Sequence, residues 1–291
     1  MNLMKKIFTA TLVVLIVLSV AGIIYVVRFQ EAVPEKAKEK GAAVKPAVPK
    51  IDSVKKRTSP PARLREVAII IDDIGYDLNV AKALLKIDAN LTFAVLPFQR
   101  HSREAAEMIH RADREVLVHL PMEPVSYPRE RPGEGALFTD MSREELVLQL
   151  RKNIDAVPHA VGVNNHMGSK FMMDDEKLSV IFKELQRKKL FFIDSRTSPD
   201  TRAYAIADDM GFRIAERKIF IDHHRDYHAI YSQLMHVAQS NDPAPKIIIG
   251  HPYPETVRAL QAATKVMREK GVSVVPASRI IKKTNKSPEK S

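Results

Sequence analysis

The sequence of 291 residues contains no cysteine. This absence excludes disulfide bonds, thiolate zinc sites, cysteine nucleophiles and a lipid-modified N-terminal cysteine, but it does not identify a compartment. The chain also lacks a glycine-rich phosphate-binding loop, and Gly168-Ser169 lacks the flanking residues of a serine nucleophile elbow. Chemistry based on a thiol, a serine elbow or a phosphate loop is therefore not expected.

An excess of basic residues is also lacking in the part of the chain where a folded domain is expected, although the net charge is +11. Residues 1–65 hold 13 Lys and Arg against 4 Asp and Glu, and residues 282–291 hold 4 against 1. The remaining residues, 66–281, hold 29 basic and 30 acidic side chains. Since a nucleic-acid-binding domain needs a basic face, we expect no nucleic-acid partner.

The N-terminal region contains one long apolar run, Ile7–Val27, of 21 uncharged residues. About 20 such residues span a bilayer as a helix. Lys5 and Lys6 precede the run, which places the short N-terminus in the cytoplasm and exports the rest of the chain. The alternative is a signal peptide cleaved near Ser19-Val20-Ala21, but the run is longer than a typical signal core.

The composition divides the chain into four parts. Residues 1–28 are predicted to be a cytoplasmic tip and transmembrane signal-anchor, and residues 29–65 a disordered linker rich in Pro, Lys and Ala. Residues 66–281 are predicted to fold, and residues 282–291 form a basic disordered tail. The folded part would thus lie on the outer side of the cytoplasmic membrane, periplasmic or extracellular, or be secreted if the signal is cleaved; the oligomeric state is left open.

Short apolar, β-branched runs alternate with helical patterns through the folded part, which predicts an α/β fold with buried parallel strands. A capping box at Ser142 and Glu145, Ser198-Pro199 as a helix start and Gly271 after a helix support this pattern. Seven or eight alternations predict a distorted (β/α) barrel of mostly parallel strands, with a doubly wound open sheet as the alternative. The predicted strands are Val67–Ile71, Leu91–Leu96, Val116–Leu120, Ala160–Val163, Leu190–Ile193, Lys218–Ile221, Ile247–Ile249 and Val272–Val275.

Polar side chains terminate most of these strands, and the carboxyl ends of parallel strands meet on one face. They are Asp72, Asp73, His119, Asn164, Asn165, His166, Asp194, Ser195, Asp222 and His251. A buried cluster of carboxylates and imidazoles is costly unless a metal or proton transfer requires it. Two His and one Asp suit a divalent ion, with zinc the expected metal, in a site that keeps positions open. A second carboxylate could activate the bound water and another His could protonate a leaving group, with Asp72 and Asp73 dividing the first two roles.

Five segments resemble the divergent polysaccharide deacetylases, an outlying branch of the carbohydrate deacetylase superfamily. The resemblance runs in order from about Val67 to Ile281, and it is carried by Ile70–Gly75 (IIDDIG), His119–Pro124 (HLPMEP), Gly162–Ser169 (GVNNHMGS), Phe192–Thr197 (FIDSRT) and Ile249–Pro252 (IGHP). It implies a distorted (β/α) barrel with a divalent metal, usually zinc, that hydrolyses N- or O-acetyl groups on sugars.

By analogy with that superfamily, Asp72 would be the catalytic base and His251 the late-strand catalytic histidine. Asp194 would orient one of the reacting groups. The implied metal ligands are Asp73, His119 and His166.

The chain departs from mainstream members, which place two His in one His-x-x-x-His motif and carry an Arg-x-Pro-Tyr motif. Here Glu123 stands four residues after His119, either as a substitute ligand or as a carboxylate at the rim.

The function that these patterns favour is metal-dependent removal of acetyl groups from an envelope polysaccharide or peptidoglycan-type glycan. The altered ligand pattern supports an alternative, a non-catalytic glycan-binding or cell-wall scaffolding protein that retains the fold. A metal phosphoesterase is a third interpretation, disfavoured because few basic residues surround the predicted site.

Overall fold

A computed structural model describes residues 64–281. The predicted membrane segment, nearly all of the linker and the basic tail lie outside the described residues. Within residues 64–281, no helix combines the length and the apolar character that a membrane span requires.

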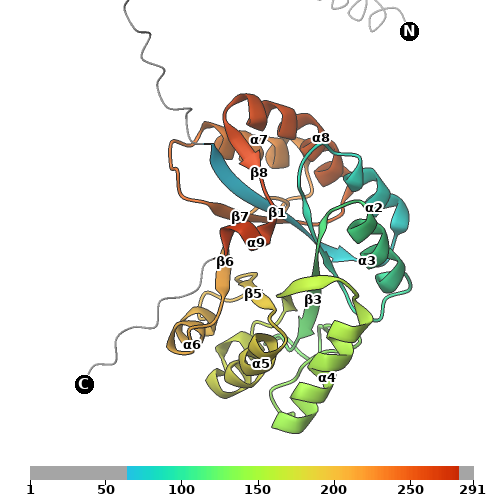
Figure 1. Cartoon of the computed structure of the whole chain (residues 1–291), viewed down its shortest axis with the longest axis vertical. Helices are drawn as coiled ribbons and strands as arrows, with labels where there is room; N and C mark the ends of the chain where they lie inside the picture. The colour runs from blue at the N-terminus through green and yellow to red at the C-terminus, as the bar shows by residue number, and fades with distance from the viewer. Residues whose placement is uncertain (1–63, 282–291) are drawn as a thin grey trace, which may run out of the picture. The chain divides into compact units, whose positions relative to one another are not determined.

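Strands and helices alternate along the described chain (Figure 1). The strands are β1 (Arg65–Ile74), β2 (Thr92–Val95), β3 (Glu115–Met122), β4 (Ala160–Met167), β5 (Phe191–Asp194), β6 (Ile214–Phe220), β7 (Lys246–Gly250) and β8 (Val272–Val274). The helices are α2 (Leu78–Leu85), α3 (Ser102–Arg111), α4 (Arg143–Ala156), the short 3-10 helix η1 (Phe171–Met173), α5 (Asp175–Arg187), α6 (Ala203–Asp209), α7 (Tyr227–Gln239), α8 (Pro254–Glu269) and α9 (Ala277–Ile280). Each predicted strand is present.

The first seven strands close into a parallel barrel. β1 pairs with β7 along Val67–Ile71 and with β2 along Ile70–Ile74, which joins the two ends of the sheet. β8 pairs with β1 over Arg65–Val67 and lies outside the ring. The barrel prediction is thus confirmed over the open doubly wound sheet, with seven strands in the ring.

Two apolar clusters stabilise the barrel. The larger fills the space between the strands and the helices that surround them (Figure 1). The smaller lies inside the ring and consists of Ala68, Ile70, Ala94, Leu117, Phe191, Ile193, Ile247, Ile249, Ala277 and Ile281. The last two come from α9 and the residue after it, and the Ala277 amide donates to Thr92 Oγ1 at 3.1 Å at the start of β2. α9 therefore closes the amino end of the barrel, opposite the predicted site.

Local signals in the sequence had mixed outcomes. The capping box of Ser142 and Glu145 forms at the start of α4, and Gly271 follows α8 with a φ of +76°. The predicted helix start at Ser198-Pro199 is wrong. Ser198 Oγ accepts a hydrogen bond from the Asp200 amide in a local turn, and α6 begins only at Ala203.

Candidate metal and catalytic site

The alternation of β1 explains how two adjacent carboxylates reach one site. Ile70 packs inside the barrel and Ile71 outside, so Asp72 points inward by the two-residue period of a strand. Asp73 would then point outward, but the register shifts between Ile71 and Ile74, and Asp73 adopts a φ of +55°. This bulge turns the Asp73 side chain to the same face as Asp72, since bulges re-aim side chains next to functional sites.

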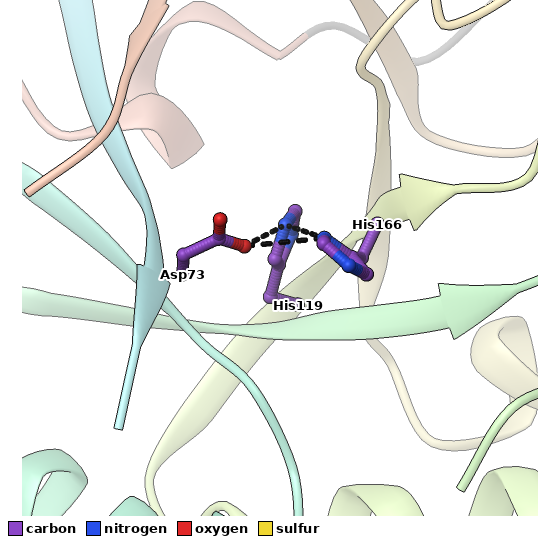
Figure 2. A group of neighbouring side chains, drawn as sticks. All are labelled: Asp73, His119 and His166. Carbon is purple, nitrogen blue, oxygen red and sulfur yellow. Dashed lines mark hydrogen bonds and ion pairs between the residues drawn. The ribbon is translucent and has the colours of Figure 1, made fainter. Parts of the chain in front are cut away.

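The same period places two histidines on that face. Leu117 of β3 packs inside the barrel, so His119, two residues later, also points inward. β4 pairs with β3 in parallel register, with His119 beside Asn164 and Pro121 beside His166. Figure 2 shows the side chains of Asp73, His119 and His166 converging from three strands.

The three side chains form a nearly equilateral triangle of ligand atoms. Asp73 Oδ1 lies 3.2 Å from His119 Nε2 and 3.1 Å from His166 Nδ1, and the two nitrogens are 3.1 Å apart. Ligands about 2.0 Å from a tetrahedral zinc ion lie ~3.3 Å from one another. Asp73 Oδ1 is buried yet accepts no well-directed hydrogen bond. An orphaned carboxylate oxygen facing two imidazole nitrogens fits a divalent cation, and these are the residues that would hold it.

The electrostatics of the triangle favour a positive charge at its centre. Burial by itself raises the pKa of Asp73, but His119 and His166 outweigh it and hold that pKa well below its usual range. Burial lowers the pKa of His119, yet Asp72 and Asp73 raise it to about 9. A proton on His119 therefore occupies the place that a metal ion would take, and metal binding would displace it.

Asn164 organises this centre from β4. Its Nδ2 donates to Asp72 Oδ1 at 2.7 Å, and its Oδ1 lies 2.9 Å from His119 Nδ1. Because an amide oxygen can only accept, His119 Nδ1 carries a proton, and in the neutral ring the unprotonated nitrogen is Nε2, which faces Asp73. Burial raises the pKa of Asp72 above its usual value, although His119, His251 and the Asn164 donor oppose that shift. Asn164 thus fixes the His119 tautomer and favours the ionised form of Asp72.

His251 follows β7 and is held by Asp222. Asp222 Oδ1 lies 3.0 Å from His251 Nδ1, and its Oδ2 accepts from the His251 amide at 2.5 Å and from Thr256 Oγ1 at 2.9 Å. Gly250 permits this approach, because a Cβ there would come within 2.9 Å of the Ile221 side chain. The ring therefore presents Nε2 to the site, 3.9 Å from Asp73 Oδ2.

Aromatic side chains fix the plane of the His251 ring. Phe220 meets it edge-on at 5.3 Å between centroids, and Tyr253 stacks on it at 5.4 Å. Burial lowers the pKa of His251, but Asp222, Asp72 and Asp73 together raise it above its ordinary value. A protonated imidazole at this position can donate a proton across the site.

Two other candidates have contacts elsewhere. Ile193 points into the barrel, so the next residue of the strand, Asp194, points away from its interior. Asp194 accepts hydrogen bonds from the Arg196 amide at 2.7 Å and from Thr201 Oγ1 at 2.8 Å in its own loop. Its predicted role in orienting a reacting group stays a prediction that these contacts do not support.

The Glu123 carboxylate binds side chains outside the triangle. It pairs with Lys170 Nζ at 2.8 Å and accepts from Thr139 Oγ1 at 2.7 Å. Glu123 connects the loops after β3 and β4, and the third member of the triangle with Asp73 and His119 is His166.

Two residues of the candidate site lacked an assigned role in the sequence interpretation: Asn164 and Asp222. The strand period could have identified Asn164, which stands two residues before His166 on the same face. Asp222 was recognised only as a residue that follows a strand, because its contact with His251 depends on how closely β6 and β7 approach.

Comparison with known proteins agrees with this architecture. Residues 69–281 match the family model described as divergent polysaccharide deacetylase. An uncharacterized protein of Escherichia coli K12, YibQ, is 37% identical over 206 residues, which is 70% of this chain and 63% of that protein. The chain therefore matches less than two thirds of that relative's length. An uncharacterized protein of Haemophilus influenzae is 33% identical over 207 residues, covering 70% of this chain and 72% of that protein.

A solved structure shares the fold. An uncharacterized protein of Agrobacterium tumefaciens C58 superposes with a TM-score of 0.70 over 77% of this chain and 92% of its own, at 19% identity. At that identity the similarity shows the architecture alone.

Proposed function

The chain belongs to the divergent polysaccharide deacetylases, and on this premise we propose that it hydrolyses acetyl groups from an envelope polysaccharide with metal-activated water. The observation that carries the proposal is the convergence of Asp73, His119 and His166 on one point, with Asp72 and His251 beside it. A divalent ion held there would polarise the acetyl carbonyl and acidify a water molecule.

Asp72 has the position of the general base. Its Oδ2 lies 3.8 Å from His119 Nε2, so it borders the ligand triangle without belonging to it. The Asp72 carboxylate would take a proton from the attacking water while the water oxygen bonds to the acetyl carbon.

His251 has the position of the general acid. Its Nδ1 is held by Asp222, so Nε2 is free to donate a proton to the departing sugar nitrogen or oxygen as the acyl bond breaks. The products are acetate and a deacetylated sugar, and the proton taken by Asp72 balances the one given by His251.

Exposed aromatic rings beside the site support a sugar substrate. Tyr76, Phe98 and Tyr127 follow β1, β2 and β3 and are 61%, 36% and 42% exposed. Large exposed aromatics grouped on one face mark a binding surface. The proposed setting is the outer side of the cytoplasmic membrane, with residues 7–27 as the anchor.

Acetate release tests the proposal. The zinc-loaded full chain is incubated with N-acetylated glycan oligomers, and its metal content is measured in parallel. We expect bound metal and acetate release in the wild type, and retained metal with release lost in Asp72→Asn. Bound metal without release from any acetylated glycan would instead support the glycan-binding alternative.

A further inference from the structure

An open groove lies beside the proposed catalytic site, between the loop after β5 and the middle of β6. Its volume is about 470 Å³, and it is lined by Arg196, Ser198, Pro199, Glu216, Arg217 and Lys218. It adjoins the site through Ser195, whose Oγ accepts a hydrogen bond at 3.3 Å from the same Asn164 amide that holds Asp72.

The lining of the groove carries an excess of positive charge. Three of its side chains are cationic and one, Glu216, is anionic. Glu216 pairs with both Arg196, at 3.4 Å, and Lys218, and the two cations are 37% and 56% exposed. Such exposed pairs are weak and exchange readily with another anion.

Arg217 is the fixed element of the groove. Its Nε and one terminal nitrogen donate to the Ser195 and Arg196 carbonyls at 2.6 and 2.9 Å, and its guanidinium lies over the Phe220 ring at 5.0 Å. These two hydrogen bonds use two of the five guanidinium N–H groups and leave its charge without an ion-pair partner among the described side chains.

The backbone at Arg196 is held in an unfavourable conformation. Arg196 has a φ of +53°, and its amide and carbonyl are fixed by Asp194 and Arg217. Non-glycine residues persist in this region only when surrounding contacts impose it, often at binding sites. The contacts of Asp194 therefore serve the groove.

A neutral sugar gains little from three cations in a groove whose lining has no aromatic ring, whereas a carboxylate or phosphate forms charge-assisted hydrogen bonds with arginine. We propose that the substrate is an acidic polysaccharide, in which a carboxylate or phosphate near the acetylated sugar binds Arg196, Arg217 and Lys218. This inference rests on the proposed function, and it specifies the substrate class.

Binding of matched probes tests the inference on the zinc-loaded full chain. The probes are an acetylated disaccharide with a carboxylate on its second sugar, its methyl ester, and the corresponding phosphomonoester, titrated by calorimetry. We expect the carboxylate to bind about tenfold more tightly than the ester, and Arg196→Gln with Lys218→Gln to reduce this ratio to about twofold.

Two further variants sharpen the test. Glu216→Gln removes the competing carboxylate and should increase the preference for the acid, whereas Lys183→Gln, an exposed cation on α5, should leave it unchanged. Tighter binding of the phosphomonoester than of the carboxylate would assign the groove to phosphate-bearing polymers, and the reverse order to carboxylated ones.

Equal binding of acid and ester by the wild type, or a preference that survives the double variant, would overturn the inference. Acetate release from the same probes separates the two claims. Acetate release with equal binding of acid and ester would support the hydrolase and refute the acidic substrate. Tighter binding of the acid with no acetate release would support recognition of an acidic polysaccharide and refute the hydrolase.

Discussion

Replacing Asn164 with leucine should weaken the candidate metal centre, because leucine keeps the branched shape and the number of heavy atoms of asparagine but makes no hydrogen bonds. The change removes the hydrogen bond that Asn164 donates to Asp72 Oδ1 at 2.7 Å and the one that it accepts from His119 Nδ1 at 2.9 Å. The Asn164 side chain is fully buried, so water cannot replace either bond. Each buried group left without a partner costs about 1–3 kcal/mol, so we expect a loss of about 3 kcal/mol in the free energy of unfolding. For a domain of this size that lowers Tm by about 10 °C.

Metal affinity gives the specific readout. Without Asn164, His119 is free to take the other tautomer, and loss of its outer hydrogen bond typically weakens metal binding by about 10- to 100-fold. The zinc Kd is measured by competition with a chromophoric chelator, and unfolding is followed by circular dichroism.

Asn165→Leu is the matched control. Asn165 is 1% exposed and makes hydrogen bonds to Met167, Ser195 and Thr197, but none to Asp72 or His119. It should lose comparable stability and retain zinc affinity. Equal zinc affinity in the two variants would refute the role assigned to Asn164.

Three further predictions concern the base, the acid and the scaffold. Asp72→Asn should lower kcat for acetate release by about 10²–10⁴-fold with an unchanged zinc content, and a smaller loss would remove Asp72 as base. Asp222→Asn should lower kcat about 10- to 100-fold with little change in KM, since it frees the His251 ring; an unchanged kcat would contradict this. Glu184, paired with Arg151 and Arg187, has its pKa lowered from 4.5 to about 2 by those partners. Its contribution to stability, about 1 kcal/mol, is therefore present above pH 4.5 and lost as pH falls toward 2, so urea unfolding of Glu184→Gln should differ from wild type at pH 7 but not at pH 2.

The fold was predictable because buried parallel strands leave a strong apolar pattern. β1 and β7 each contain a run of three isoleucines, and both strands were located from that apolar pattern. β6 was placed too late, since it begins at Ile214 and its residues are only partly buried. β4 continues through Asn164, Asn165 and His166, which were expected to follow it, and β3 extends two residues beyond the predicted Leu120.

The sequence predicted which residues lie together in the candidate site, but not how each side chain is oriented there. Asp73, His119 and His166 were expected together and do lie together, whereas their binding of a metal stays a prediction. The bulge that turns Asp73 inward leaves no trace in the sequence, because it depends on the register between β1 and β2. The cationic groove combines β6 with the loop after β5, so no sequence motif contains it.

Because α9 and the apolar cluster inside the ring close the amino end of the barrel, the candidate site is reached only from the carboxyl ends of the strands among the described residues. If the chain has the proposed deacetylase activity, acetate would leave at the same end of the barrel at which the polysaccharide binds. Acetate at high concentration would then inhibit the reaction as a product.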